Sequence, residues 1–82
     1  MNVILSKNAH KQYERLSGIQ RTKVRKKLEA LSKDAYAGKK LVGELSPLRS
    51  LKVWPYRIIY EVNDQIKMIE VHKIAHRQGV YK

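Results

Sequence analysis

The apolar residues of this chain change their spacing after Pro47, and this change restricts the fold more than any other feature. Before Pro47 they recur every three or four positions, which is typical of amphipathic helices. After it, runs rich in aromatic and β-branched residues are separated by short turn-like segments, which is typical of strands. The sequence therefore predicts helices in its first half and a small sheet in its second half.

Two helices are predicted. Ser6 can cap a helix over residues 7–16, and Ser17 with Gln20 has the spacing of a capping box at the start of a second helix over residues 19–34. One face of each helix is apolar: Ala9, Tyr13 and Leu16 in the first, and Val24, Leu28, Leu31 and Ala35 in the second. These faces are expected to pack on the sheet.

Four strands are predicted, over residues 2–5, 48–53, 56–62 and 66–74, with a loop over residues 36–47. The expected fold is α+β, with the two helices packed on one face of a small, mainly antiparallel four-stranded sheet. At 82 residues the chain is expected to form a single domain.

Turn lengths predict the register of the last three strands. The expected pairs are Val53 with Tyr56, Lys52 with Arg57, Val62 with Ile66, and Arg57 with Val71. One face then carries Tyr56, Ile58, Tyr60, Val62, Ile66, Met68 and Ile74 beneath the helices, and the other carries Ser50, Lys52, Arg57, Ile59, Ile69, Val71 and Lys73. Two directly opposed cations, Lys52 and Arg57, are unfavourable unless an anion such as a phosphate binds there.

The balance of charge points to an anionic partner. Eighteen Lys and Arg residues against seven Asp and Glu give a net charge of +11, which favours nucleic acid, an acidic protein or an anionic membrane surface. The absence of cysteine excludes disulfides, thiol nucleophiles and thiolate zinc sites. No apolar stretch is long enough to span a membrane and no signal-peptide pattern is present, so a cytoplasmic protein is expected.

Two groups of residues could carry chemistry. The basic run of the second helix either forms a solvated face or contacts phosphates without reading sequence; it contains Arg21, Lys23, Arg25, Lys26 and Lys27. His72 and His76 have the spacing of metal ligands on a helix, but His72 falls on a predicted strand, where residues four apart share a face yet lie far apart, so neither a metal nor another cofactor is expected.

The second group comprises Lys52, Arg57, His76, Arg77 and Tyr81. Cleavage of a phosphodiester without a metal requires removal of a 2′-hydroxyl proton, cations that stabilise charge in the transition state, and protonation of the leaving oxygen. Lys, Arg and His side chains can supply all three. Tyr81 or Trp54 can stack on an unpaired base.

The stretch LVGELSPLRSLKVWPYRIIYEV, followed by IEVHKIAHRQGVY, resembles the RelE/ParE superfamily of type II toxins. The resemblance implies a RelE-like toxin that cuts mRNA on the ribosome, an endoribonuclease of the mRNA interferase type. Cleavage by 2′-hydroxyl attack would leave a 2′,3′-cyclic phosphate. A cognate acidic antitoxin would block the toxin, and operator DNA would be bound only through the antitoxin complex.

The resemblance also implies roles for individual residues. Arg57 matches the arginine of the superfamily's Tyr-Arg pair, and Arg77 matches a late arginine; both would bind and stabilise the scissile phosphate. Lys52 matches a basic strand position, and His76 stands where relatives carry Lys or His, so either would transfer protons. Tyr81 matches the terminal tyrosine and would orient the substrate.

Two departures keep other functions open. Ser50 stands where active relatives often carry another basic residue, and Trp54–Pro55 replaces a glycine that is frequent in the turn. The smaller basic set is compatible with a ParE-like toxin that inhibits DNA gyrase and is not a nuclease. A general RNA- or DNA-binding module is a third reading.

Overall fold

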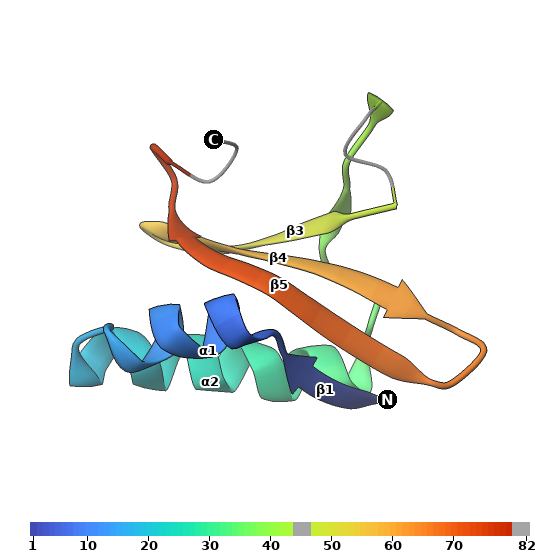
Figure 1. The fold of residues 1–82 in the computed structure, drawn as a ribbon, viewed down its shortest axis with the longest axis horizontal. Coiled ribbons are helices and arrows are strands. Elements are labelled where there is room, and N and C mark those ends of the chain that lie inside the picture. The colour runs from blue at the N-terminus through green and yellow to red at the C-terminus, as the bar shows by residue number, and fades with distance from the viewer. Residues whose placement is uncertain (44–46, 80–82) are drawn as a thin grey trace.

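Two helices cover one side of a five-stranded sheet in the computed structural model, which describes residues 1–43 and 47–79 (Figure 1). The elements are β1 (Asn2–Leu5), α1 (Lys7–Glu14), α2 (Gly18–Lys33), β2 (Lys39–Lys40), β3 (Arg49–Val53), β4 (Tyr56–Asn63) and β5 (Met68–His76). The predicted α+β fold is confirmed. The structure adds β2, a two-residue strand, within the segment that was predicted to be a loop.

Both helices begin at the predicted serines. The hydroxyl of Ser6 accepts a hydrogen bond from the backbone N–H of Ala9, and that of Ser17 accepts one from Gln20. Ser6 also donates to the carbonyl of His72, which ties the start of α1 to β5. Only the serine half of the capping box forms, because the buried side-chain oxygen of Gln20 has no hydrogen-bond partner among the described residues.

The strand order is β1-β5-β4-β3-β2. β1 runs parallel to β5, and the other neighbours are antiparallel. The first and last strands of the chain are therefore partners, whereas β3, β4 and β5 form the predicted meander. The β3–β4 register is as predicted: Lys52 pairs with Arg57 and Val53 with Tyr56, across a turn whose Trp54–Pro55 peptide bond is cis.

The predicted register of β5 is wrong. Val62 pairs with Ile69, three residues beyond the predicted Ile66, because the turn is longer and Asn63 pairs with Met68. The side-chain oxygen of Asn63 accepts two backbone N–H groups within this turn, which holds the longer turn in place. Ile66, which was predicted to lie beneath the helices, is 62% exposed.

A β-bulge then changes the register again. The observed pairs are Tyr60 with Val71, Ile59 with Lys73, and Arg57 with Ala75, so His72 is the extra residue. Before the bulge, the observed register differs from the predicted one by three residues, and an odd difference reverses the face of each side chain. Ile69 and Val71, which were predicted on the face away from the helices, therefore lie in the core. After the bulge the difference is four residues, an even number, so Lys73 and Ile74 lie on their predicted faces.

The core lies between the helices and the sheet. It comprises Ala9, Leu16, Val24, Leu31, Ala35, Val53, Ile58, Tyr60, Ile69, Val71 and Ile74, with Tyr13 and Leu28 packed against it. The predicted apolar faces of both helices are thus confirmed. In the described part of the chain, neither helix is long and apolar enough to cross a membrane.

Candidate anion-binding site

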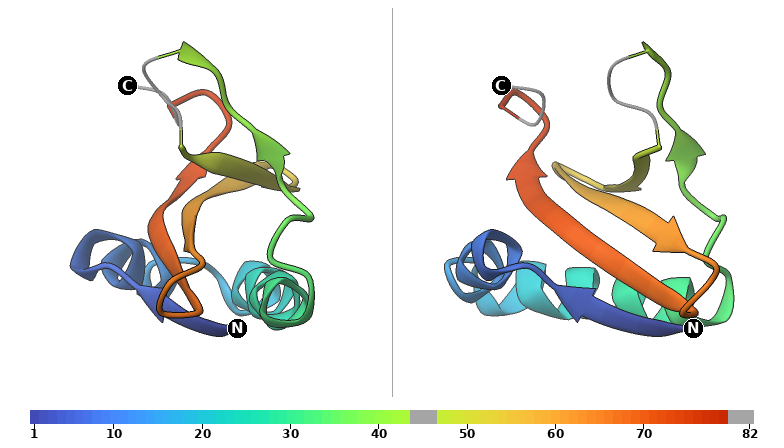
Figure 2. Two further views of the ribbon diagram at one scale, coloured as in Figure 1. Left: turned by 90° about the vertical axis from the view of Figure 1, so that its right-hand side faces the viewer. Right: turned by 45° about the vertical axis from the view of Figure 1, so that its right-hand side comes forward.

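The side of the sheet away from the helices, called the open face below, gathers basic residues. Strand pairing places its side chains in two adjacent rows: Lys39, Ser50, Ile59 and Lys73 in the first, and Lys52, Arg57 and Ala75 in the second. Neighbouring strands lie about 4.8 Å apart, so side chains within a row are in reach of one another. Residues 39–43 and 77–79 rise on this same side (Figure 2).

Two adjoining pockets open onto this face, and both are lined by Lys39, Ser50 and Arg57. The larger, of about 510 Å³, extends along Leu41 and Val42. The smaller, of about 400 Å³, extends to Ala37, Leu51 and Lys52. Among the described residues, no Asp or Glu lines either pocket, so the electrostatic environment favours an anion.

Ser50 forms part of the floor of both pockets. The residue is 6% exposed, and its hydroxyl has no hydrogen-bond partner within the described ranges. A buried hydroxyl without a partner costs about 1–3 kcal/mol of stability. The hydroxyl is therefore available to donate a hydrogen bond to a bound group.

Lys52 and Arg57 form a pair of opposed cations at the centre of the second row. Lys52 is exposed and Arg57 is half-buried. Like charges directly across a strand pair destabilise a sheet unless a counter-charge is present. This arrangement suits a phosphate lying between the two side chains.

Arg77 and Trp54 meet at the end of the β3–β4 hairpin. The guanidinium of Arg77 lies 4.6 Å from the centre of the Trp54 ring, and the Arg77 backbone N–H donates to the carbonyl of Pro55. Trp54 remains 60% exposed. A flat ring beside a cation provides a surface on which an unpaired base can stack.

Of the other two predicted residues, His76 does not join this arrangement. His76 pairs with Tyr56, on the helix side of the sheet, and their rings meet edge to face with centres 5.7 Å apart. The imidazole therefore points away from Lys52 and Arg57. Tyr81 lies outside the described residues.

The segment before β2 is held by a buried tyrosine. The hydroxyl of Tyr60 donates to the carbonyl of Ala35 and accepts the backbone N–H of Gly38, both within 2.9 Å. Burial of the Tyr60 side chain raises the pKa of its phenol. A methyl group at Gly38 would lie 2.5 Å from the Tyr60 hydroxyl, so only glycine fits here. These contacts fix the position of the adjoining Lys39.

Arg49 supports the same segment. Its guanidinium donates to the carbonyl of Gly38 at 3.0 Å and lies 4.9 Å from the centre of the Tyr36 ring. The Tyr36 hydroxyl donates in turn to Asp64 in the β4–β5 turn, and this hydrogen bond raises the pKa of the Tyr36 phenol. Arg49 therefore acts on β2 and is not part of the pockets.

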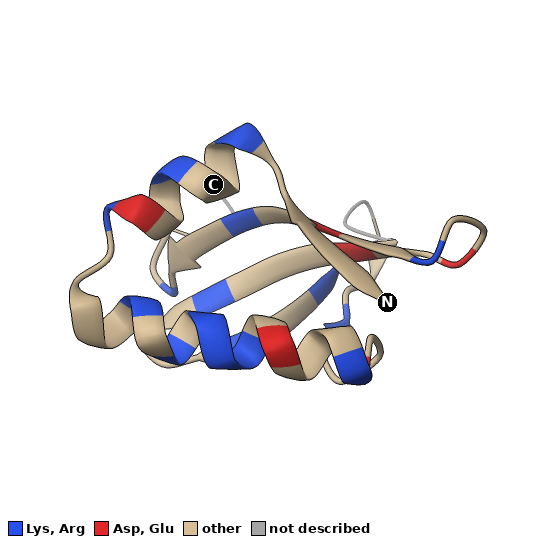
Figure 3. Ribbon diagram, turned by 90° about the horizontal axis from the view of Figure 1, so that it is seen from below, with Lys and Arg blue, Asp and Glu red and all other residues tan. Residues whose placement is uncertain are grey.

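The basic residues of α2 lie on the helix side of the molecule (Figure 3). All five, Arg21, Lys23, Arg25, Lys26 and Lys27, are exposed. Arg25 lies 3.9 Å from Glu29, and Arg21 and Arg25 line a shallow pocket next to Tyr13. The helices separate this surface from Lys52 and Arg57, so among the described residues it is a second basic surface, distinct from the open face.

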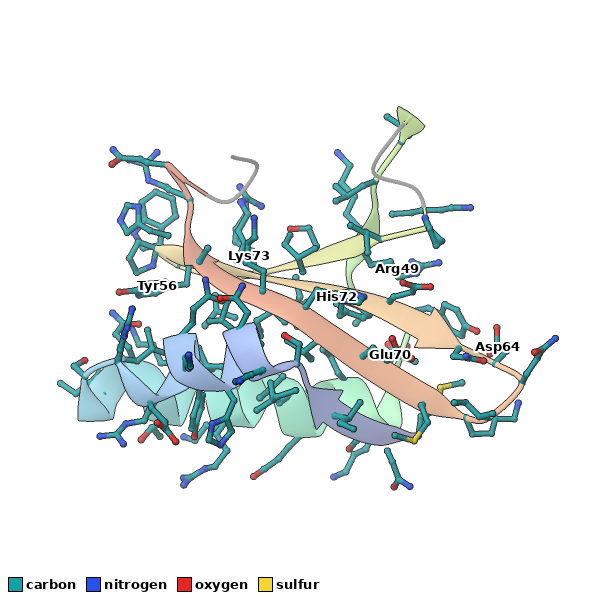
Figure 4. The ribbon with its side chains drawn as sticks, viewed as in Figure 1. Arg49, Tyr56, Asp64, Glu70, His72 and Lys73 are labelled. Atoms are coloured by element: carbon teal, nitrogen blue, oxygen red, sulfur yellow. The ribbon has the colours of Figure 1, made fainter. Side chains whose placement is uncertain are left out.

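Acidic residues occupy the part of the open face nearest the β4–β5 turn. Glu61 and Glu70 are directly paired, and His72 contacts Glu61 at 3.2 Å. Figure 4 shows Glu70, His72 and Lys73 in succession along β5, leading away from this turn. Three ligand atoms of Glu61, Glu70 and His72 lie within 4.8 Å of one another, which makes this group the one that could hold a metal in the described part of the chain.

Sequence reasoning did not select Lys39 and Lys40. A two-residue strand has no periodic pattern that could be recognised, and residues 36–47 contain two glycines and a proline, which predict a loop. The adjacent Lys39–Lys40 pair was the one available signal. Its meaning depends on pairing with Ser50 and Arg49, which the sequence alone does not show.

Comparison with known proteins gives both family and fold matches. The model of a family described as the ParE toxin of the type II toxin–antitoxin system parDE matches residues 3–81. A chain of the toxin–antitoxin complex RelBE2 from Mycobacterium tuberculosis is similar in structure, with a TM-score of 0.86 and 23% identity over 93% of this chain and 96% of that one. No curated protein sequence gives a match.

Two further solved structures share the fold. The isolated RelE toxin of E. coli has a TM-score of 0.80 and 24% identity, over 98% of this chain and 89% of that one. The YoeB/ParE toxin from Agrobacterium tumefaciens has a TM-score of 0.82 and 18% identity, over 94% of this chain and 99% of that one.

Proposed function

Because the chain belongs to the ParE toxin family of type II toxin–antitoxin systems, we propose that this toxin is a ribosome-dependent mRNA endonuclease. One observation carries the proposal. Lys52 and Arg57 are opposed on the open face, beside two pockets that no described carboxylate lines. A phosphodiester offers a counter-charge, which no described residue provides to this pair.

The proposed reaction needs no metal. The 2′-oxygen of a ribose attacks the adjacent phosphorus, the bond from phosphorus to the 5′-oxygen breaks, and a 2′,3′-cyclic phosphate and a 5′-hydroxyl result. The 2′-hydroxyl proton passes to water, and the leaving 5′-oxygen receives a proton from the Lys52 ammonium, which solvent then restores. Arg57 would stabilise the additional negative charge of the transition state.

The remaining residues have supporting roles. Arg77 and Trp54 would hold the neighbouring nucleotide, because a base can stack on the exposed indole ring. Between the two proton-transfer candidates, Lys52 is favoured, since the His76 ring contacts Tyr56 on the other side of the sheet. A substrate-orienting role for Tyr81 rests on the resemblance to RelE-like toxins.

The second basic surface supports action on the ribosome. The five cations of α2 face away from the open face and would contact ribosomal RNA phosphates while the open face meets mRNA. A cognate acidic antitoxin is the proposed inhibitor, as toxin–antitoxin complexes are known for the similar RelE chains. Contact with operator DNA is proposed only through that complex.

Inhibition of DNA gyrase without cleavage is the second candidate. The family model that matches this chain is that of a ParE toxin. In addition, Ser50 stands on the open face at a position where active relatives often carry a basic residue. On this alternative, the basic residues would meet protein or DNA, and no phosphodiester would react.

One experiment separates the two functions. Purified toxin is added to ribosomes programmed with a defined mRNA, and the product ends are mapped. The proposal expects cleavage with 2′,3′-cyclic phosphate ends in the wild type and none in Arg57→Ala. Intact mRNA together with loss of gyrase supercoiling would overturn the nuclease proposal in favour of the alternative.

A further inference from the structure

The position of Lys39 is fixed by the fold. Lys39 pairs directly with Ser50 on β3. The preceding segment is anchored by the Tyr60 hydroxyl, which bonds to Gly38 and Ala35. The ammonium group of Lys39 can move, but its stem starts beside the Ser50 hydroxyl.

Ser50 carries the second, independent observation. Its side chain is more than nine-tenths buried, lines both pockets and has no hydrogen-bond partner within the described residues. Most buried hydroxyls in native structures are paired, and an unpaired one requires an explanation. A ligand that accepts a hydrogen bond in the pocket provides one.

We propose that Lys39, Ser50 and Arg57 form a phosphate-binding subsite that holds a backbone phosphate next to the one that reacts. Ser50 donates a hydrogen bond, Lys39 supplies the positive charge that a serine cannot supply, and Arg57 is shared with the reacting phosphate. The three side chains line both pockets. This inference rests on the proposed function for its choice of RNA, but phosphate binding can be measured without cleavage.

The subsite lies beside the reactive pair and is not identical to it. Ser50 and Lys52 are two residues apart on β3, on the same face and separated by about 6.6 Å at about 3.3 Å per residue. A nucleic acid strand carries one charge per nucleotide, so a strand bound at Lys52 brings a second phosphate towards Lys39 and Ser50. Because this second phosphate does not change in the reaction, its contacts bind ground state and transition state equally.

The kinetic consequence distinguishes the subsite from the reactive pair. Loss of uniform binding raises KM and leaves kcat unchanged, whereas loss of a transition-state contact lowers kcat. Ser50→Ala and Lys39→Gln should therefore raise KM about three- to tenfold with little change in kcat. Lys52→Ala should instead lower kcat.

Binding is tested with inorganic phosphate and with a 2′-deoxy oligonucleotide, which cannot be cleaved. Phosphate should shift the backbone amide signals of Lys39, Ser50 and Arg57 in proton–nitrogen NMR spectra of the whole chain. Ser50→Ala and Lys39→Gln should each weaken binding of both probes at least threefold. Lys33→Gln at the end of α2 removes the same charge as Lys39→Gln and is the matched control, with wild-type affinity expected.

Ser50→Ala also tests the folded state. Since the substitution removes an unpaired buried hydroxyl, the variant should melt at or above the wild-type temperature. Wild-type phosphate affinity in folded Ser50→Ala and Lys39→Gln would overturn the subsite, even if cleavage persists. Weakened phosphate binding in both variants would support it, even if wild type cleaves no mRNA and the proposed function fails.

Discussion

Lys52 on β3 and Arg57 on β4 face each other directly across the antiparallel ladder, on the side of the sheet that the helices leave open. Two cations in this position destabilise the sheet by about 0.2–1 kcal/mol when no anion lies between them. The pair therefore lowers the stability of the free protein but can stabilise a complex in which an anion is bound between the two side chains.

Removing one cation of this pair should separate stability from activity. Arg57→Ala or Lys52→Ala should lower the rate of mRNA cleavage on programmed ribosomes about a hundredfold, because a fixed charge at the transition state is worth about 3 kcal/mol. Growth inhibition should be lost as well. The free energy of unfolding, measured with urea, should stay the same or rise, since repulsion is relieved. A variant that loses activity together with several kcal/mol of stability would contradict this.

Trp54 should report binding at the end of the hairpin. It is the only tryptophan in the sequence and its ring is exposed next to Arg77. A 2′-deoxy oligonucleotide should quench its fluorescence, because a base stacks on the indole ring. Arg77→Ala should weaken the binding measured in this way. Unchanged fluorescence, while binding is seen by an independent method, would place the nucleic acid elsewhere.

Tyr60→Phe should destabilise the fold and displace Lys39. The change leaves the buried carbonyl of Ala35 and N–H of Gly38 without their partner, at a cost of about 1–3 kcal/mol in urea unfolding. Gly38→Ala should have a similar effect, because the added methyl group meets the Tyr60 hydroxyl. Phosphate affinity should fall in both variants. Loss of stability with unchanged phosphate affinity would show that Tyr60 does not position Lys39 for phosphate binding.

The stabilising effect of the Tyr60 hydroxyl should depend on pH. Because burial raises the pKa of this phenol in the folded state, its contribution is fully present below the ordinary tyrosine pKa. It is lost as the pH rises through the raised value. The difference in stability between wild type and Tyr60→Phe should be constant at neutral pH and shrink in strongly alkaline solution. A difference that grows with pH would contradict this assignment.

An acidic antitoxin peptide should stabilise the chain in a salt-dependent manner. At a free concentration of 100 times its Kd, a ligand of the native state adds about 2.7 kcal/mol. For a domain of this size each kcal/mol raises Tm by about 4–8 °C. The effect should decrease with added salt because the net charge of +11 attracts the peptide. An equal rise in Tm at low and high salt would argue against an electrostatic complex.

Features set by neighbouring residues were predictable from the sequence. Serines followed by an apolar period of three to four predict both helices, and the tight turn at Trp54–Pro55 predicts the pairing of Lys52 with Arg57. In each case, the information lies within a few residues of the feature. The central pair of the candidate site is therefore encoded locally, in the hairpin that carries both of its cations.

Features set by distant contacts were not predictable. The bulge at His72 and the partnership of β1 with β5 depend on packing across the whole molecule. The same is true of β2, whose two residues are placed by Tyr60 and Ser50 rather than by their own pattern. The orientation of the His76 ring follows from the register of β5, so its place beside Tyr56 could not be predicted from local spacing.

The partnership of β1 with β5 also bears on when the protein becomes active during its own synthesis. β5 is the last of the described strands to be made, yet it pairs with both β1 and β4 and provides Ile69, Val71 and Ile74 to the core. A nascent chain that lacks β5 therefore has helices with no complete sheet to cover, and such long-range pairing is slow. On the proposed function, the toxin cannot attack the ribosome that is still translating β5. A partner protein synthesised at the same time can therefore fold before the toxin becomes active.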